Sequence, residues 1–376
     1  MINLGRGMPS ADLIDTIGLA QAVQGVLARD AGTTLGYGSP AGYQPLREWV
    51  AARHGVDPCC VMITPGAMQA VLLATEVLVG CGAGGEVLVD LPTYDMVLQA
   101  LTSRGLTVRR FDAAGERDAA GAGRRCVYTV PTFRNPDGVT VALPERQVLL
   151  ERATSAGAVV IEDDPYRELR FAGAGLPSLW ELSGSDRVVH VSSFSKTVCP
   201  GLRVGYVIAD ERLIESLTAA ANRMYITPSM FAQAIAHQYV VEGGLDGPLE
   251  RMRAKLAARA DLLCELLDEE LPQAGFERPQ GGYFVWLRLS GTMRASDLAS
   301  AAQRHGVAVA PGGGFFLDGG ERYVRLCFAA EPPDRIAEGV RRLAAAAAAA
   351  SGAGRTSQEA AGRPQLGEEP VLAHPA

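Results

Sequence analysis

The stretch HVSSFSKTVCPGLRVGYVIAD, residues 190–210, decides how the fold of this chain is interpreted. Its first part has the apolar body and serine-rich end of a buried strand, and a second apolar strand follows the turn. Lys196 stands in that turn, after Ser193 and Ser195 and before Arg203. A lysine at a strand end is most often a solvated charge. Hydroxyls and a guanidinium suit a phosphate, however, and a lysine beside a phosphate pocket is a candidate for Schiff-base chemistry.

The segments around this stretch alternate between strand and helix patterns. Short apolar runs at 86–92, 106–112, 126–131 and 158–164 are separated by helical patterns, among them 64–80 and 143–157. This rhythm predicts an α/β fold, in which helices cover both faces of a mostly parallel sheet in three layers. Ligands of such sheets lie beyond the carboxyl ends of the strands. We therefore expect Lys196 at the active edge of the sheet.

The rest of the chain predicts a second, smaller domain. A long charged helical pattern at 247–271 leads into alternating strand and helix signals, which indicate a small α+β domain. We expect residues 1–34 to form an N-terminal arm and part of the small domain, residues 35–250 the large domain, and residues 251–350 the small one. Residues 351–376 lack apolar periodicity, which predicts a disordered tail.

Composition excludes several classes of function. The chain has 376 residues and a net charge of −7, whereas a nucleic-acid surface would be basic. Seven cysteines without a Cys-x-x-Cys pair, and five scattered histidines, predict neither a metal site nor a disulfide framework. No apolar run approaches the length of about 20 residues that a membrane span needs. The N-terminus has no apolar signal core, so we expect a cytoplasmic protein with reduced thiols.

A run of acids supplies a second group of candidate residues. The segment IEDDPYREL ends an apolar strand with Glu162, Asp163 and Asp164 and continues to Tyr166. Pyridoxal phosphate needs a carboxylate to keep its ring nitrogen protonated, and donors such as Asn135 and Tyr166 suit its ring oxygen. Three acids at a strand end would otherwise form a solvated loop, but the apolar strand before them favours one acid at the active edge.

Several motifs, in order, give the chain a family resemblance. SFSKTVCPGLRVGY, NPDG, DDPY and RLCFA follow the pattern of class I/II aminotransferases, fold-type-I enzymes that depend on pyridoxal phosphate. The chain is most similar to the branch of 2-aminoadipate and kynurenine aminotransferases, and the resemblance covers residues 1 to about 345. It implies a large domain of the aspartate aminotransferase type, a pyridoxal 5′-phosphate cofactor, and the exchange of an amino group between an L-amino acid and a 2-oxo acid.

The resemblance also implies a role for each matching residue. Lys196 matches the lysine that forms the Schiff base, and Asp163, three residues before Tyr166, matches the partner of the ring nitrogen. Asp164 does not hold the matching position. Arg325 matches the arginine that binds the substrate α-carboxylate. The remaining matches are Asn135 and Tyr166 for the ring oxygen, Ser193, Ser195 and Arg203 for the phosphate, and Gly7 and Asn135 for the substrate.

Three further segments fit the same pattern. Gly66, Ala67 and Met68 stand at the start of a predicted helix, where backbone amides hold a phosphate; an ordinary glycine-initiated helix is the alternative. Tyr94 stands where relatives stack an aromatic ring on the cofactor. Tyr37 stands where the partner subunit of relatives contacts the phosphate, which implies a homodimer with shared active sites; without the resemblance it would be a packed loop aromatic.

The sequence motifs specify the cofactor more closely than they specify the substrate or the reaction. Arg134 and Asp137 depart from the family pattern, Asp90 replaces the usual Glu, and Arg134 is equally compatible with binding a distal carboxylate and with a surface role. Elimination, decarboxylation or oxidation on the same cofactor are the alternatives to transamination. A sensor domain related to transcription regulators is a further alternative, disfavoured because the aminotransferase pattern begins at residue 2. We expect the glycine-rich segment 311–320 to be a mobile loop at the mouth of the site.

Overall fold

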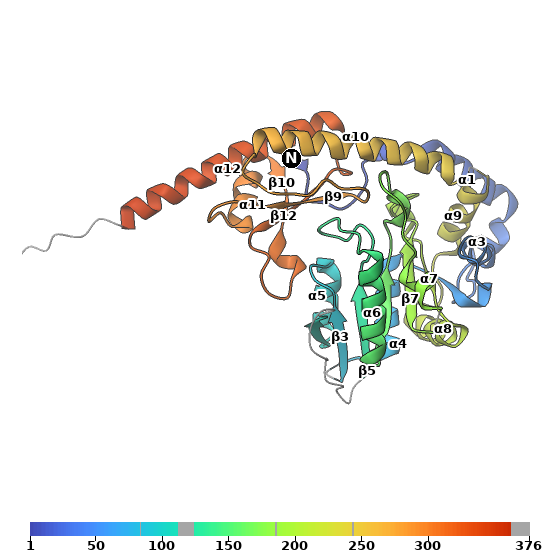
Figure 1. Cartoon of the computed structure of the whole chain (residues 1–376). Coiled ribbons are helices and arrows are strands. Elements are labelled where there is room, and N and C mark those ends of the chain that lie inside the picture. Colours follow the sequence, from blue (N-terminus) through green and yellow to red (C-terminus); the bar gives the residue numbers. More distant parts are fainter. Residues whose placement is uncertain (83, 112–123, 185, 243, 362–376) are drawn as a thin grey trace, which may run out of the picture.

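A mixed β-sheet forms the centre of the large domain in the computed structural model, which describes residues 1–82, 84–111, 124–184, 186–242 and 244–361 (Figure 1). Within these residues the sheet has seven strands, of which β8 alone runs antiparallel to its neighbours β2 and β7. The α/β architecture predicted from the alternating pattern is thereby confirmed. In spatial order the strands are β2 (Val61–Thr64), β8 (Gly205–Ile208), β7 (Val188–Ser193), β6 (Val159–Asp163), β5 (Arg124–Thr129), β3 (Gly85–Val89) and β4 (Thr107–Arg110).

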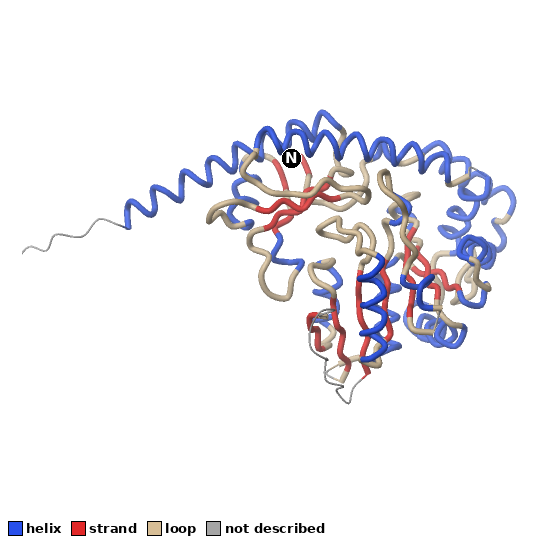
Figure 2. Tube along the Cα trace, in the orientation of Figure 1, coloured by secondary structure: helices blue, strands red, loops and turns tan. Residues whose placement is uncertain are grey.

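Helices cover both faces of this sheet, as Figure 2 shows by secondary structure. α4 (Ala67–Val79) packs against β5, β6, β7 and β8 on one face, and α5 (Asp95–Ser103) and α8 (Glu211–Tyr225) pack beside α4. α6 (Leu143–Ser155) and α7 (Leu179–Ser183) pack on the opposite face. Both faces are apolar, which explains why the parallel strands appear in the sequence as nearly continuous hydrophobic runs.

Consecutive residues of β6 point to opposite faces of the sheet. Val160 belongs to the apolar cluster on the α6 side, and Ile161 belongs to the cluster on the α4 side. A strand has a side-chain period of two, so Glu162 continues the face of Val160 and Asp163 continues the face of Ile161. This alternation separates the neighbouring acids at the end of β6.

The small domain is built on a separate antiparallel sheet with the order β11 (Ala310–Pro311), β12 (Tyr323–Cys327) and β9 (Phe284–Arg288). β1 (Ile2–Asn3) pairs in parallel with β10 (Val307–Ala308), so the start of the chain lies on this domain. α11 (Ala295–Arg304) and α12 (Pro333–Ala361) pack together here. α12 continues to Ala361, into the segment predicted to be disordered, and residues 362–376 lie outside the described residues.

α10 (Asp246–Glu270) is a 25-residue helix that runs along both domains (Figure 1). On the large-domain side, Arg253 donates to the carbonyl oxygen of Glu168 at 2.5 Å. Glu168 belongs to the short 3₁₀ helix Arg167–Leu169, which follows β6. Further along, Arg259 donates to Ser10 Oγ and Asp12 Oδ2, at 2.8 and 2.5 Å. Beyond these contacts α10 packs against α12. The helix therefore connects the two domains.

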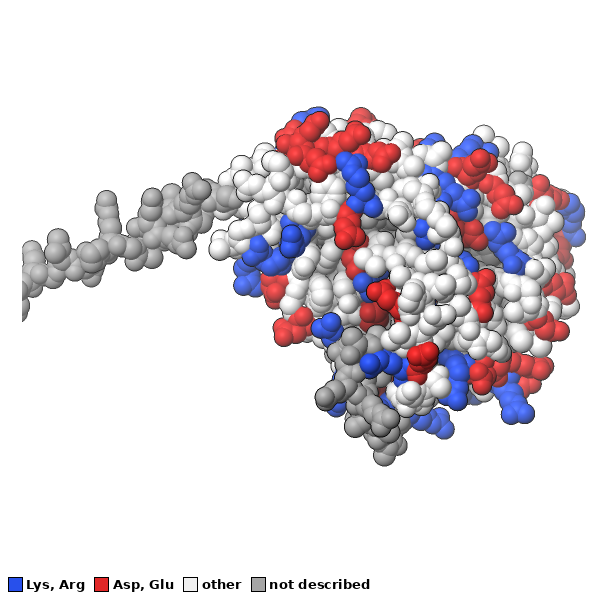
Figure 3. Space-filling model, in the orientation of Figure 1, with Lys and Arg blue, Asp and Glu red and all other residues white. Residues whose placement is uncertain are grey.

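The remaining helices complete the N-terminal side of the large domain and the connecting turns. α1 and α3 pack against α9. No helix among the described residues has the length and apolar character needed to span a membrane. Figure 3 shows acidic and basic side chains interspersed on the face drawn there. The bounds are α1 (Thr16–Arg29), α2 (Ala31–Thr34), α3 (Gln44–His54) and α9 (Met230–Glu242), with short 3₁₀ helices at Ala11–Leu13, Pro58–Cys60, Arg167–Leu169, Pro200–Leu202 and Gly312–Phe315.

Candidate active site

A cavity of about 610 Å³ lies at the carboxyl edge of the large sheet, where the small domain meets it. The cavity brings together segments that are far apart in the sequence, including the start of the chain and β12 of the small domain. Most of the residues predicted from the sequence line it, whereas Gly66 stands beside it and Tyr37 lies elsewhere. The lining includes Gly7, Ala67, Met68, Tyr94, Asn135, Asp163, Tyr166, Ser193, Ser195, Lys196, Arg203 and Arg325.

Lys196 lies in the turn after β7 and is held among aromatic rings. Its ammonium nitrogen lies 5.7 Å from the centroid of the Tyr166 ring and 5.6 Å from that of Tyr283. Nζ donates to the carbonyl oxygen of Gly7 at 2.8 Å. Burial, together with the nearby charges of Arg203 and Arg325, lowers the pKa of Lys196 to about 8. The amine is therefore close to the neutral form that a nucleophile or a base requires.

Asp163 ends β6 with one carboxylate oxygen bonded and the other free. Oδ2 accepts a hydrogen bond of 2.8 Å from the hydroxyl of Tyr128 on the neighbouring strand β5. Oδ1 is buried and has no hydrogen-bond partner among the described residues. Burial raises the pKa of Asp163 to about 6, despite the hydrogen bond from Tyr128. An unpartnered buried carboxylate oxygen that lines a cavity fits a cationic N–H donor such as a protonated pyridine nitrogen.

An anion site lies where β7, the turn after it and the start of α4 converge. Ser193 Oγ donates to Ser195 Oγ at 3.0 Å, and Arg203 Nη1 donates to Ser195 Oγ at 3.3 Å. α4 begins after Gly66 without a side-chain cap, so its first amides remain free to bind an anion. Gly66 has a φ of +90°, and a Cβ there would lie 2.6 Å from Nη2 of Arg203. These groups fit the phosphate of the cofactor.

Arg325 on β12 supplies a second site for an anion. Its Nη1 donates to Asn135 Oδ1 at 2.5 Å, and its Nη2 donates to the carbonyl oxygen of Gly5 at 2.6 Å. The guanidinium lies 4.5 and 4.8 Å from the ring centroids of Phe284 and Phe315. Its Nε is buried without a hydrogen-bond partner among the described residues. A planar cation fixed in this way has the geometry for bidentate binding of a carboxylate.

The glycine-rich segment 311–320 packs at the mouth of the cavity. Phe315 is buried, and its ring meets that of Trp286 edge to face at 5.6 Å. The backbone amide of Thr93, just before α5, donates to the carbonyl oxygen of Phe315 at 2.9 Å. Figure 1 shows the same segment descending from the small domain toward α5. These contacts pack the segment against Trp286 and the start of α5 in this conformation, and its mobility at the mouth of the site stays a prediction.

Arg134, whose role the sequence left open, belongs to a buried charge cluster. Its guanidinium donates to Asp137 Oδ2 at 2.7 Å and to Asp90 Oδ2 at 2.9 Å. Its side chain is 11% exposed. Three departures from the family pattern therefore pair with one another, and neither the proposed surface role nor binding of a distal carboxylate describes Arg134. A spacing pattern in one chain does not reveal such a pairing, because Asp90 lies far from Arg134 in the sequence.

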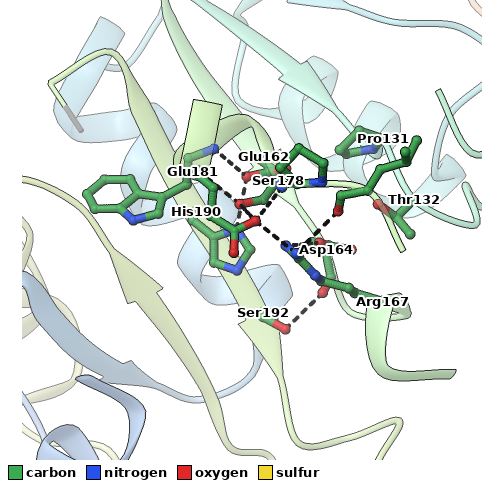
Figure 4. A network of polar contacts seen from close by, with 12 residues as sticks. Pro131, Thr132, Glu162, Asp164, Arg167, Ser178, Glu181, His190 and Ser192 are labelled. Carbon is green, nitrogen blue, oxygen red and sulfur yellow. Dashed lines mark hydrogen bonds and ion pairs between the residues drawn. The ribbon is translucent and has the colours of Figure 1, made fainter. Parts of the chain in front are cut away.

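A polar network around Glu162 and His190 occupies the opposite face of the sheet (Figure 4). Both oxygens of Glu162 accept hydrogen bonds: Oε1 from the amide of Leu179 at 2.8 Å, and Oε2 from that of Trp180 at 3.1 Å and from His190 Nδ1 at 2.9 Å. Burial opposes ionisation, but these bonds hold the pKa of Glu162 below its usual value. Glu162 is therefore a satisfied buried anion at the start of α7.

Asp164 differs from Glu162 although both face the network. Its carboxylate oxygens have no hydrogen-bond partner among the described residues, and Arg167 Nη1 lies 4.0 Å away. Burial and the charge of Glu162 raise the pKa of Asp164 to about 7. The ligand-type atoms of Glu162, Asp164 and His190 lie within 4.8 Å of one another, a proximity that histidine spacing did not predict. Arg167 and His190 supply the positive charge here, so a metal ion is not needed to balance the acids.

Sequence reasoning missed several residues that shape the site. Tyr128 bonds Asp163, the hydroxyl of Tyr283 donates to the carbonyl oxygen of Lys196 at 2.9 Å, and Arg6 lines the cavity. The position of Tyr128 at the carboxyl end of a strand beside Asp163 is a signal that could have identified it. Tyr283 and Arg6 lie in segments whose approach to Lys196 depends on the packing of the two domains.

Comparisons with known proteins identify the family of this chain. The family model "aminotransferase class I and II" matches residues 1–343. The 2-aminoadipate transaminase of Thermus thermophilus is 36% identical over 356 residues, which are 91% of this chain and 89% of that protein. An aromatic-amino-acid aminotransferase of Thermococcus litoralis is 31% identical, over 92% of this chain and 87% of its own length.

A solved structure gives the same result in three dimensions. The α-aminoadipate aminotransferase of Thermus thermophilus, in complex with N-(5′-phosphopyridoxyl)-L-leucine, superimposes with a TM-score of 0.87 and 35% identity. The similarity covers 94% of this chain and 93% of that one. The fold of the chain thus has a counterpart in an enzyme that was solved with a pyridoxyl-phosphate derivative. The chain belongs to the class I and II aminotransferases, enzymes of fold type I that use pyridoxal 5′-phosphate to transfer an amino group.

Proposed function

We propose that Lys196 is the catalytic amine of this aminotransferase and that Asp163 is the counter-ion of its cofactor. The observation that carries the proposal is the buried, unpartnered Oδ1 of Asp163 in the cavity that also holds Lys196. When bound, pyridoxal phosphate supplies an aldehyde that reacts with amines and a cationic ring that accepts electron density from the substrate Cα. The roles below follow from this assignment.

Lys196 moves the proton that transamination requires. Its pKa of about 8 leaves part of the amine neutral near neutral pH, so it can remove the proton from Cα of an amino acid. Tyr166 and Tyr283 border the ammonium group, and the carbonyl oxygen of Gly7 orients it. The same amine would then deliver this proton to C4′ of the cofactor rather than back to Cα, and hydrolysis by water would release the 2-oxo acid while the amino group stays on the cofactor.

Asp163 and the anion sites hold the reacting groups. Asp163 stabilises the positive charge on the ring nitrogen through Oδ1, while Tyr128 fixes the other oxygen. Ser193, Ser195, Arg203 and the amides of Ala67 and Met68 would hold the phosphate. Tyr94 would stack on the ring, and Asn135 and Tyr166 would donate to its oxygen.

Arg325 holds the substrate by its α-carboxylate. Its two end nitrogens face Asn135 and Gly5, and its unpartnered Nε keeps donor capacity for an anion. A retained carboxylate disfavours decarboxylation, because the departing group would leave a buried cation without a partner. The substrates in this proposal are an L-amino acid and a 2-oxo acid.

We further propose a cytoplasmic homodimer in which Tyr37 completes the site of the partner subunit. Tyr37 is 86% exposed, beside Leu35, which is 64% exposed. Thr227 donates to the carbonyl oxygen of Ser39 at 3.2 Å, which brings Ile226, 56% exposed, close to the same surface. Exposed apolar side chains that gather in this way favour a protein interface. Free cysteines throughout the described residues favour a reducing compartment.

The assignment of Lys196 is tested by chemical trapping. Borohydride reduction of the holoenzyme followed by peptide mapping should label Lys196, and Lys196→Ala should lose both the visible absorbance of the lysine-bound cofactor and the half-reaction with amino acids. Lys255, whose side chain is about half-exposed on α10, is the matched control. A label on any lysine other than Lys196 would refute the assignment.

The role of Tyr37 is tested by mixing two inactive chains. If Tyr37 acts in the partner's site, hybrids of Tyr37→Ala and Lys196→Ala chains have one site with both defects and one with neither. Activity should then return to about half per hybrid dimer, provided that the subunits exchange and that Tyr37→Ala is severe. If activity does not return in verified hybrids, Tyr37 does not act in trans.

A further inference from the structure

The strip Gly5–Arg6–Gly7 lies between the two cations that the proposed function assigns to the substrate. The carbonyl oxygen of Gly5 accepts from Arg325 Nη2 at 2.6 Å, and that of Gly7 accepts from Lys196 Nζ at 2.8 Å. An amino acid held by its carboxylate at Arg325, with Cα near Lys196, must therefore lie along this strip. Arg6 is the one residue between the two contacts, and it lines the cavity.

The two glycines fix the strip against the small domain. A Cβ at Gly5 would lie 2.9 Å from the carbonyl carbon of Val309, and one at Gly7 would lie 2.8 Å from the ring of Phe284. Both distances are shorter than a carbon–carbon contact permits. The backbone thus lies close to its neighbours on both sides of Arg6, and Arg6 contributes the long side chain of the strip.

The charges of the cavity leave Arg6 without a partner. Within the described part of the chain, the cations that line it are Arg6, Lys196, Arg203 and Arg325. Arg203 contacts Ser195 in the proposed phosphate site, and Arg325 contacts Asn135. The guanidinium of Arg6 has neither a hydrogen bond nor an ion pair with any described residue, and it is exposed. Arg134 is already neutralised by two aspartates and does not compete for an anion.

We propose that Arg6 binds the side-chain carboxylate of a dicarboxylic substrate, which makes it a specificity-determining residue. The inference rests on the proposed function, because it takes the positions of the α-carboxylate and of Cα from Arg325 and Lys196. Met8 and Met96 line the same cavity and are partly exposed, so they suit the methylene groups between the two carboxylates. The substrate class is an amino acid or 2-oxo acid with a second carboxylate at the end of a short chain.

The test compares L-glutamate with L-glutamine, which has nearly the same shape but no side-chain charge. Each is mixed with wild type, Arg6→Ala, Arg6→Lys and the surface control Arg304→Ala, and kcat/KM of the half-reaction is followed by cofactor absorbance. Arg6→Ala should lower kcat/KM for L-glutamate about 10- to 100-fold and for L-glutamine less than about 3-fold. Arg6→Lys should be intermediate because it keeps the charge but loses the bidentate geometry. Arg304→Ala should match wild type.

Binding of unreactive acids gives a second readout. Calorimetry of the holoenzyme should show glutarate binding more tightly than butyrate, and Arg6→Ala should remove most of this difference. Equal losses for L-glutamate and L-glutamine would overturn the role of Arg6, as would a wild-type preference for basic amino acids, which would implicate Asp95 of the same cavity. If no amino acid, including L-leucine, changes the cofactor absorbance of wild type, the proposed function itself fails.

Discussion

Asp163 and Glu162 are neighbouring acids on opposite faces of the sheet at the end of β6, and they differ in their hydrogen bonding. On the α4 face, Asp163 has one oxygen bonded by Tyr128 and one left for a ligand. On the α6 face, Glu162 accepts three hydrogen bonds that use both of its oxygens. Both are buried carboxylates on one strand, so burial alone does not distinguish function from structure. The difference lies in unused hydrogen-bonding capacity in the cavity that holds Lys196, which supports the proposed binding role of Asp163 and a structural role for Glu162.

Asp163→Asn gives the sharpest test of this comparison. The amide cannot balance the charge of the ring nitrogen, so the rate of the half-reaction should fall about 100- to 1,000-fold, measured by stopped-flow absorbance under single turnover. Cofactor content should remain high, because the phosphate and lysine contacts persist. Asp164→Asn serves as the neighbouring control and should be far milder. The reverse ranking would show that the two faces have been assigned wrongly.

Glu162→Gln should act mainly on stability. Removing the charge leaves His190 and two amides of α7 around a weaker acceptor, so the free energy of unfolding should fall by about 3 kcal/mol. Urea unfolding with an active-site-independent probe measures the change, and the half-reaction rate of the folded variant should stay within about threefold of wild type. Glu338→Gln, on the surface of α12, should leave the unfolding midpoint unchanged. A large rate loss in a stable Glu162→Gln enzyme would contradict the structural role.

Asp164→Asn should have a stability effect that depends on pH. The pKa of about 7 lies above that of an unfolded aspartate, so the folded protein binds this proton more tightly and the carboxylate destabilises it at higher pH. Wild type and variant should therefore unfold alike near pH 4, and the variant should be more stable by roughly 3–4 kcal/mol at about pH 8. Denaturant titrations across this range measure the difference, with exposed Asp186→Asn as control. A variant less stable at alkaline pH would mean that Arg167 stabilises the charged form.

Tyr128→Phe should have the smallest effect, and it tests the hydrogen bond that Oδ2 of Asp163 accepts from Tyr128. The variant loses one hydrogen bond to Oδ2, which favours the ionised carboxylate, so the acid limb of the half-reaction profile should move to higher pH. The rate at neutral pH should fall about 5- to 10-fold. Tyr225→Phe is a matched control, because that buried hydroxyl has no hydrogen-bond partner among the described residues. An unchanged pH profile in Tyr128→Phe would mean that this bond does not tune Asp163.

Local patterns in the sequence predicted the features that depend on residues close together in the chain, namely the strands and the direction of side chains along them. Apolar runs with polar ends gave the strands, and the spacing from Asp163 to Tyr166 selected, among three neighbouring acids, the one that lines the cavity. The period of two explains that choice, because Glu162 and Asp164 face the other side of the sheet. The two faces therefore differ for a reason that is already present in the strand pattern.

Partners distant in the sequence could not be predicted in this way. The pairing of Arg134 with Asp90, the bond from Tyr128 to Asp163 and the closeness of Arg6 to Lys196 depend on how elements pack. No spacing rule specifies contacts across two domains. α12 also continues to Ala361, beyond residue 350, where apolar periodicity in the sequence ends.

The attachment of α10 gives the two domains a mechanical connection. A helix of 25 residues is about 37 Å long, and it is tied by Arg253 beside the active-site strand and by α12 at its other end. By geometry alone, a tilt of about 5° at the Arg253 end would displace the far end by about 3 Å. Such a tilt would therefore shift the small domain, which carries Arg325, relative to the large one.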